Sequence, residues 1–165
     1  MVGGAVKEFF KLIGGATKFE KLRKAIEDEL LGIERVAISL ENLIQYLRKE
    51  EEPAENYVKR LINDSYSELK KATDVRKRIK NMKAELENYR KNITEFEEAS
   101  KIDAYLDSLE VFEKQLLDTL FGINKILKDI ESESVKITNK SYFIVRLNDS
   151  VKALRKLIQE LKQFK

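Results

Sequence analysis

The chain has 165 residues, enough for one domain with a sizeable core. Hydrophobic residues make up 42% and charged residues 37% of it, which excludes a disordered chain, while one Pro and six Gly leave little turn material for a fold of many strands. The 32 basic and 29 acidic residues nearly balance and leave a net charge of +3. This excludes the strong positive electrostatic field that would draw the whole protein onto DNA.

A first long helix is predicted over residues 17–50. Thr17 and Glu20 have the spacing of a capping box, in which each side chain bonds a backbone N–H of the first helical turn. The helix should end before Pro53, because the residue before a proline avoids the α region. Its apolar residues recur at steps of three and four: Phe19, Leu22, Ile26, Leu30, Ile33, Ala37, Leu40, Ile44 and Leu47.

Residues 54–99 carry a narrower, heptad-spaced apolar seam of the kind found in coiled coils. Its positions are Val58, Leu61, Ser65, Glu68, Ala72, Val75, Ile79, Met82, Leu86, Tyr89, Ile93 and Phe96. The two polar positions, Ser65 and Glu68, also have capping-box spacing. We therefore expect a break near residues 63–65 and a long helix over 65–99; one continuous helix is the alternative.

A third long helix is predicted over residues 101–133, starting at a cap formed by Ser100. One face carries Ile102, Tyr105, Leu109, Phe112, Leu116, Leu120, Ile123, Leu127 and Ile130. Because Leu117, Phe121 and Ile126 widen this apolar arc, we expect this helix to be the most buried.

The last helix is predicted over residues 141–164, and its stripe is Ile144, Leu147, Val151, Leu154, Ile158 and Leu161. The segment 132–140 before it has alternating apolar residues, Val135 and Ile137, which suggests a short extended connection. The three longer helices would each be about 50 Å long. Matched lengths and short connections predict an all-α, elongated antiparallel four-helix bundle with coiled-coil-like long helices. This bundle forms a single domain over residues 16–165, preceded by a short amphipathic helix within residues 1–15.

Catalysis of the familiar kinds is not supported by the residues present. The sequence has no Cys and no His, which excludes disulfides, thiolate metal sites and Ser-His-Asp or Cys-His arrangements. No phosphate-binding loop motif is present. The strongest carboxylate cluster is Asp103, Asp107 and Glu110, which falls opposite the apolar stripe and reads as a hydrated acidic face. We expect no enzyme activity, no cofactor and no metal, and no small-molecule substrate is evident.

Two amphipathic termini are the first candidate surfaces. The N-terminal segment gathers Val6, Phe9, Phe10, Leu12 and Ile13 on one side of a helix. This segment would bind a membrane surface or a partner, or, as we prefer, close the open end of the bundle as a lid. The last helix carries a basic face of Lys152, Arg155, Lys156 and Lys162. That face would bind an anionic membrane or an acidic partner, or, as we prefer, simply be solvated.

Two further surfaces concern contacts between helices or chains. The acidic face of Asp103, Asp107 and Glu110 would meet the basic last helix, within one chain or between two. Leu31 and Ile38 lie seven residues apart on the outer side of the first long helix, and they would seed a self-association seam.

These features favour a non-enzymatic helical interaction or scaffold module that binds a protein partner or a second copy of itself. The alternative is a peripheral membrane protein that uses both amphipathic termini. Non-specific nucleic-acid binding through the basic run 70–83 is a weaker alternative, because those charges surround the seam and no aromatic residues interleave with them. Without a transmembrane-length apolar run or a signal-peptide pattern, we expect a cytoplasmic location. The abundance of Lys, Glu and Ile without Cys resembles a thermophile's composition, and an AT-rich genome would give a similar one.

Overall fold

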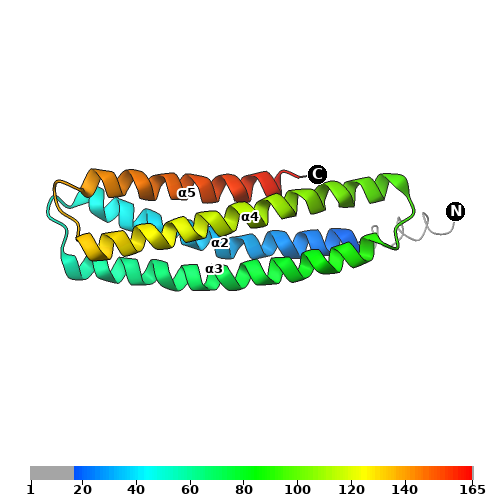
Figure 1. Cartoon of the computed structure of the whole chain (residues 1–165), viewed down its shortest axis with the longest axis horizontal. Coiled ribbons are helices and arrows are strands. Elements are labelled where there is room, and N and C mark those ends of the chain that lie inside the picture. The colour runs from blue at the N-terminus through cyan, green and yellow to red at the C-terminus, as the bar shows by residue number, and fades with distance from the viewer. Residues whose placement is uncertain (1–16, 165) are drawn as a thin grey trace.

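The computed structural model describes residues 17–164, and this part of the chain forms four helices and no strand. The helices are α2 (Lys18–Lys49), α3 (Glu55–Arg90), α4 (Phe96–Glu133) and α5 (Lys140–Lys162). They lie side by side and alternate in direction as an elongated bundle (Figure 1). Helix α2 packs against α3 and α5, and α4 packs against the same two helices, so α2 and α4 lie diagonally opposite. The predicted antiparallel four-helix bundle is confirmed; the amphipathic segment 1–15 lies outside the described residues.

The core consists of the apolar stripes that the helical period places on one face. In α2 and α4, every residue of the two predicted stripes is buried, from Phe19 to Leu47 and from Ile102 to Ile130. Thr17 caps α2 as expected, because its Oγ1 accepts a hydrogen bond of 3.2 Å from the Glu20 amide. The N-terminal boundary and the inward face of α2 therefore both follow from local sequence.

The predicted break near residues 63–65 is wrong, because α3 is continuous through it. Ser65 is completely buried between Ile62 and Leu69, and these two residues replace Leu61 and Glu68 in the buried seam. A break would free the capping-box groups but expose apolar side chains on both sides of Ser65. A cap contributes about 1 kcal/mol, whereas burying one aliphatic side chain contributes about 1.5–3 kcal/mol. Burial therefore favours the continuous helix.

The boundary between α3 and α4 also differs from the prediction. Helix α3 ends at Arg90 instead of near residue 99, and α4 begins at Phe96 instead of near Ser100. The last turn of α3 is closed by tighter backbone bonds, from the Asn92 amide to the Tyr89 carbonyl and from the Ile93 amide to the Arg90 carbonyl, each 3.1 Å long. As a result Phe96, which the heptad spacing places in the seam, is 85% exposed.

The connection before α5 is a compact turn and not an extended segment. The Asn139 side chain accepts a bond of 2.7 Å from the Lys136 amide and donates one of 2.8 Å to the Ser134 carbonyl. Ser134 adopts a positive φ of 61°, which turns the chain at the end of α4. Helix α5 begins at Lys140, close to the predicted residue 141, but Phe143 takes the fully buried position and Ile144 is only partly buried.

Helix α5 is the shortest of the four and stops before the end of the bundle that carries the α3–α4 connection (Figure 1). At this point Phe164 packs on Tyr105 with ring centroids 5.2 Å apart, and Tyr105 packs on Phe19 at 5.8 Å. The Arg23 guanidinium donates a hydrogen bond to the Phe164 carbonyl, which fixes the segment that follows α5 to α2.

Ion pairs join all four pairs of neighbouring helices and so help to set their register. They are Arg78–Glu29 at 2.9 Å between α3 and α2, Lys83–Glu113 at 3.6 Å between α3 and α4, Arg146–Asp129 at 3.0 Å between α5 and α4, and Arg155–Glu34 at 3.5 Å between α5 and α2.

Candidate interaction surfaces

The widened apolar arc of α4 faces outward over part of its width, so the prediction that α4 is the most buried helix is wrong: α2 buries as many residues over a shorter length. Leu117 is 48% exposed and Phe121 is 71% exposed, whereas Ile126 is only 6% exposed and belongs to the core. Helices α3 and α5 pack against α4 and leave the outer part of this arc uncovered. The middle of this arc therefore presents two large apolar side chains, Leu117 and Phe121, one helical turn apart, to solvent.

A groove of about 370 Å³ runs beside these two residues, between α3 and α4. Leu117, Phe121 and Asn124 form its α4 side, and Tyr66 and Leu69 are among the residues on its α3 side. Desolvation by burial, reinforced by a hydrogen bond to Glu131, raises the pKa of the Tyr66 hydroxyl above its usual range. Tyr66 is thus held neutral and fixed to α4, and the groove has a mainly apolar wall.

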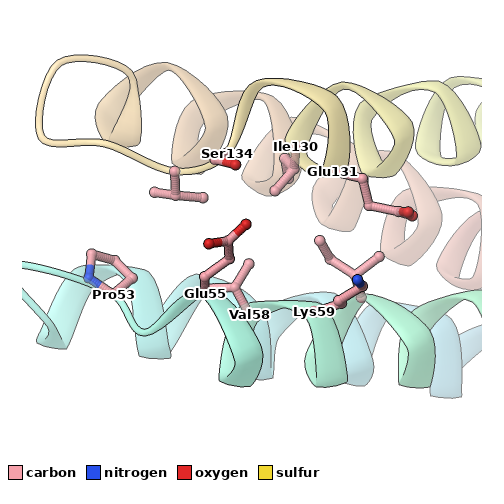
Figure 2. A pocket seen from close by; sticks show the side chains of 9 residues that line it. Pro53, Glu55, Val58, Lys59, Ile130, Glu131 and Ser134 are labelled. Atoms are coloured by element: carbon pink, nitrogen blue, oxygen red, sulfur yellow. The ribbon is translucent and has the colours of Figure 1, made fainter.

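A second pocket, of about 290 Å³, lies where α3 begins and α4 ends. Figure 2 shows Glu55 reaching from α3 towards the α4 side of this pocket, where Glu131 and Ser134 lie. Val58 and Ile130 are apolar lining residues, and Lys59 supplies a positive charge. Two carboxylates, one ammonium and no nucleophile beyond a serine hydroxyl make this a gap between helix ends and not a recognisable catalytic arrangement.

Leu31 and Ile38, the predicted self-association residues, are both exposed, at 53% and 45%. They lie along shallow depressions between α2 and α3, and Arg35 lines both depressions. Helices α2 and α3 pack closely here, because Gly32 leaves space for the Val75 side chain. Because Arg35 lies between Leu31 and Ile38 along α2, a positive charge separates the two apolar residues.

The predicted basic face of α5 is partly engaged within the bundle. Arg155 contacts Glu34 at 3.5 Å and also pairs with Glu41, both on α2. Lys156 pairs with Glu160 one turn away at 3.9 Å. Lys152 and Lys162 are exposed at the surface. Arg155 thus joins α5 to α2, which leaves a smaller basic surface than the four positions predicted from sequence.

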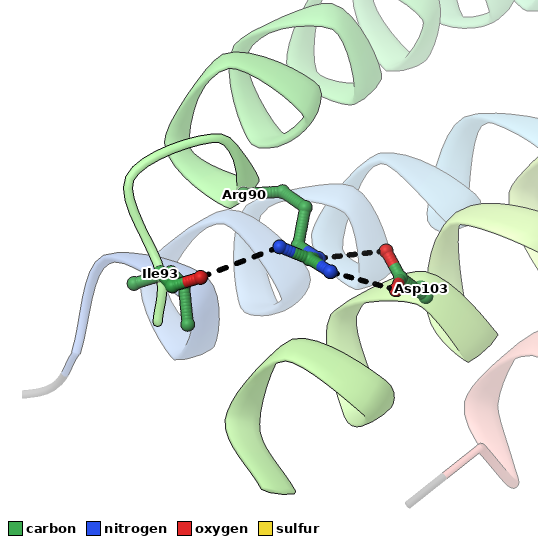
Figure 3. Close-up of polar contacts among 3 residues, drawn as sticks. All are labelled: Arg90, Ile93 and Asp103. Carbon is green, nitrogen blue, oxygen red and sulfur yellow. Dashed lines mark hydrogen bonds and ion pairs between the residues drawn. The ribbon is translucent and has the colours of Figure 1, made fainter. Parts of the chain in front are cut away.

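The predicted acidic face is exposed, and its first member joins α4 to α3. Figure 3 shows Arg90 reaching Asp103 through two parallel hydrogen bonds of 2.8 and 3.1 Å and contacting the Ile93 carbonyl at 3.4 Å. The hydrogen bond to Asp103 raises the pKa of the Arg90 guanidinium further above its ordinary value. Glu110 pairs with Lys114 on the same helix at 3.8 Å, and Asp107 lines a groove between α4 and α5. For Asp103 the structure therefore places the partner on α3, not on the basic α5.

Within residues 17–164, no group of three or more acidic side chains is arranged to hold a metal ion. In the same region, no helix combines the length and apolarity needed to cross a membrane. The outward pair Leu117 and Phe121 was missed because adjacent apolar residues in α4 do not reveal which of them faces the core. The signal that could have found it is a second three-and-four pattern on this helix, with charged residues at both of its ends.

No family model, curated protein or solved structure matches this chain.

Proposed function

We propose that this protein is a non-enzymatic helical interaction module that presents faces of its bundle to another protein chain. The observation that carries the proposal is the pair Leu117 and Phe121, which are exposed beside a groove whose wall is mainly apolar. Exposed apolar residues that gather along a groove are typical of docking surfaces for amphipathic helices.

The surrounding structure supports this proposal. Both residues lie near the middle of α4, a helix of 38 residues that packs against two neighbours, so they project from a rigid support. Leu120 and Leu116, the adjacent residues on the inner side, are buried in the core and fix the rotation of the helix. A partner would therefore meet preorganised side chains, which lowers the conformational entropy lost on binding.

A peripheral membrane role is the second candidate, because α5 exposes Tyr142 and Val145 at 57% and 58%. Aromatic and aliphatic residues with nearby lysines suit a membrane interface. The pairing of Arg155 with two α2 carboxylates reduces the positive charge available for anionic lipid. The α4 surface is therefore the better supported of the two.

The test is site-specific photo-crosslinking in native cell extract, with the crosslinker in place of Phe121 and, as a matched control, in place of the exposed α3 residue Glu87. We expect discrete protein adducts from position 121 that disappear when Leu117→Glu is added, and none from position 87. Equal labelling at both positions would show that contact at position 121 is unspecific and would overturn the proposal. No adduct at position 121, together with co-sedimentation of the protein with anionic vesicles, would overturn it in favour of the membrane role.

A further inference from the structure

We infer that the outer face of α4 is an antiparallel homodimer interface, in which Leu117 of each copy packs against Phe121 of the other. This inference rests on the proposed function and names one partner for it, a second copy of this chain. The surface consists of six residues spaced by alternating steps of four and three, and we call it the α4 outer stripe: Glu110, Lys114, Leu117, Phe121, Asn124 and Lys128.

The α4 outer stripe has the geometry of a coiled-coil seam on the solvent side of a helix that already has a core seam. Five of its residues are exposed, and Asn124 is half-buried in the groove wall. The stripe is about 27 Å long, which is two and a half heptads. Steps of four and three keep such a seam facing one partner helix.

Charge and size complementarity identify the partner as a second copy. When two α4 helices lie antiparallel with the symmetry axis at position 119, Leu117 meets Phe121 of the other copy. The same register sets Lys114 opposite Asn124 and Glu110 opposite Lys128, and symmetry repeats each pairing. Apolar residues then occupy the centre of the contact, and opposite charges close both of its ends.

Other arrangements of the same stripe place unfavourable pairs together. A parallel dimer opposes Glu110 to Glu110 and Lys128 to Lys128. An antiparallel dimer centred on Phe121 opposes Lys114 to Lys128. Shifting the antiparallel register by a heptad moves both Leu117 and Phe121 onto polar or charged residues. The sequence of the stripe therefore selects one register among these arrangements.

The α2 surface around Leu31 and Ile38 does not share this property. Arg35 lies between the two apolar residues in the same stripe. In a parallel pair Arg35 faces its own copy, and in an antiparallel pair it falls opposite Leu31 or Ile38. A second copy therefore fits α4 better than α2, although α2 is the surface that sequence spacing alone had favoured.

The groove between α3 and α4 supplies the space for the partner's side chains. Leu117 and Phe121 form one edge of this groove, and Tyr66 and Leu69 form part of the other. A leucine or phenylalanine of the second copy that packs on Leu117 or Phe121 would lie at the edge of this groove and be partly covered by it. The contact is short, so we expect association in the micromolar to millimolar range, as for other small interfaces.

The test is sedimentation equilibrium of the full chain from about 10 µM to about 1 mM, a range that brackets the association expected of a small interface. Glu110→Lys and Lys128→Glu each replace two attractive pairs by two repulsive ones, so each should weaken dimerisation about tenfold. The double variant restores opposite charges and should return the dissociation constant to within about threefold of the original. The control Lys24→Glu makes the same change of charge as Lys128→Glu, but on α2, which lies diagonally opposite α4. It should leave dimerisation unchanged.

Leu117→Glu should abolish association without affecting the helical circular dichroism, because Leu117 lies outside the core. The inference would be overturned if the double charge variant dimerised as weakly as the single variants, or if the control weakened dimerisation as much as they do. A monomer at every concentration would also overturn it, yet adducts to a different protein in the crosslinking experiment would still support the proposed function. A dimer that is broken by Leu31→Glu and not by Leu117→Glu would move the interface to α2 and reject the α4 register.

Discussion

The same substitution at two helical glycines should change stability in opposite directions, because only one of the two lies in a close helix contact. A Cβ atom added at Gly32 in α2 would lie 2.6 Å from Cγ2 of Val75 in α3. A Cβ added at Gly122 in α4 would have no such neighbour within 4 Å. Both glycines lie inside helices, so the intrinsic preference for alanine applies to both.

The magnitude follows from two opposing contributions. Alanine is favoured over glycine in a helix interior by about 1 kcal/mol. Overpacking in a well-packed core costs about 1–3 kcal/mol. The Val75 side chain cannot easily move away, because it is 3% exposed and its β-branch restricts its rotamers. Gly32→Ala should therefore lower the free energy of unfolding by about 1 kcal/mol, while Gly122→Ala should raise it by about 1 kcal/mol.

Thermal and urea unfolding followed by circular dichroism measure both changes, which correspond to melting-temperature shifts of about 2–4 °C in a protein of this size. A double-mutant cycle isolates the contact: in a Val75→Ala background the Cγ2 atom is gone, and only the Cβ at 3.8 Å remains near the new methyl group. Gly32→Ala should then become stabilising. If it stabilises in both backgrounds, α2 and α3 are not as close at this point as the structure places them.

Three further outcomes are expected. Ser65→Ala should stabilise the protein by about 1 kcal/mol in urea unfolding, because the buried Ser65 hydroxyl has no hydrogen-bond partner among the described residues and alanine is the better helix former; destabilisation would indicate that the hydroxyl is bonded. Burial raises the pKa of the Tyr105 hydroxyl, so the unfolded chain releases this proton at a lower pH than the folded chain does. The contribution of Tyr105 to the free energy of unfolding should therefore be fully present below about pH 10 and be lost at higher pH. Tyr105→Phe should make that fall shallower in pH-dependent unfolding, and an unchanged slope would contradict this assignment. Asp118→Asn should strengthen dimerisation in sedimentation, because Asp118 flanks the proposed symmetry axis and would lie near its own copy; weaker association would argue against that axis.

The inward faces of the helices could be predicted from the sequence because they depend on period alone. The residues of the apolar stripe from Phe19 to Leu47 in α2 recur at steps of three and four, so one rotation of the helix buries all of them. The capping box at Thr17 was also reliable, because nothing in the tertiary structure competes with it. At Ser65 the same motif failed, because capping there would have cost the burial of Ile62 and Leu69.

The candidate surface on α4 could not be assigned from the sequence, for a geometrical reason. Leu116 and Leu117 are adjacent and equally apolar, as are Leu120 and Phe121, and the helical period assigns both members of each pair to the apolar arc. The positions of α3 and α5 decide between them: Leu116 is completely buried and Leu117 is 48% exposed. Prediction of such a surface requires the bundle cross-section, which depends on long-range contacts.

The arrangement of charge around Leu117 and Phe121 is what separates a functional surface from an accidental one. Two exposed apolar residues on a long helix need no explanation by themselves, since much of any protein surface is apolar. Here, however, Glu110 and Lys128 stand at equal distances on either side of the pair, and neither residue belongs to the core. The bundle would fold nearly as well with these two charges exchanged or made alike, because both side chains are exposed and the surface pair of Glu110 with Lys114 contributes little. An antiparallel second copy would not dock equally well with two like charges, because like charges would then meet at both ends of the contact. Making the two charges alike therefore tests docking separately from folding.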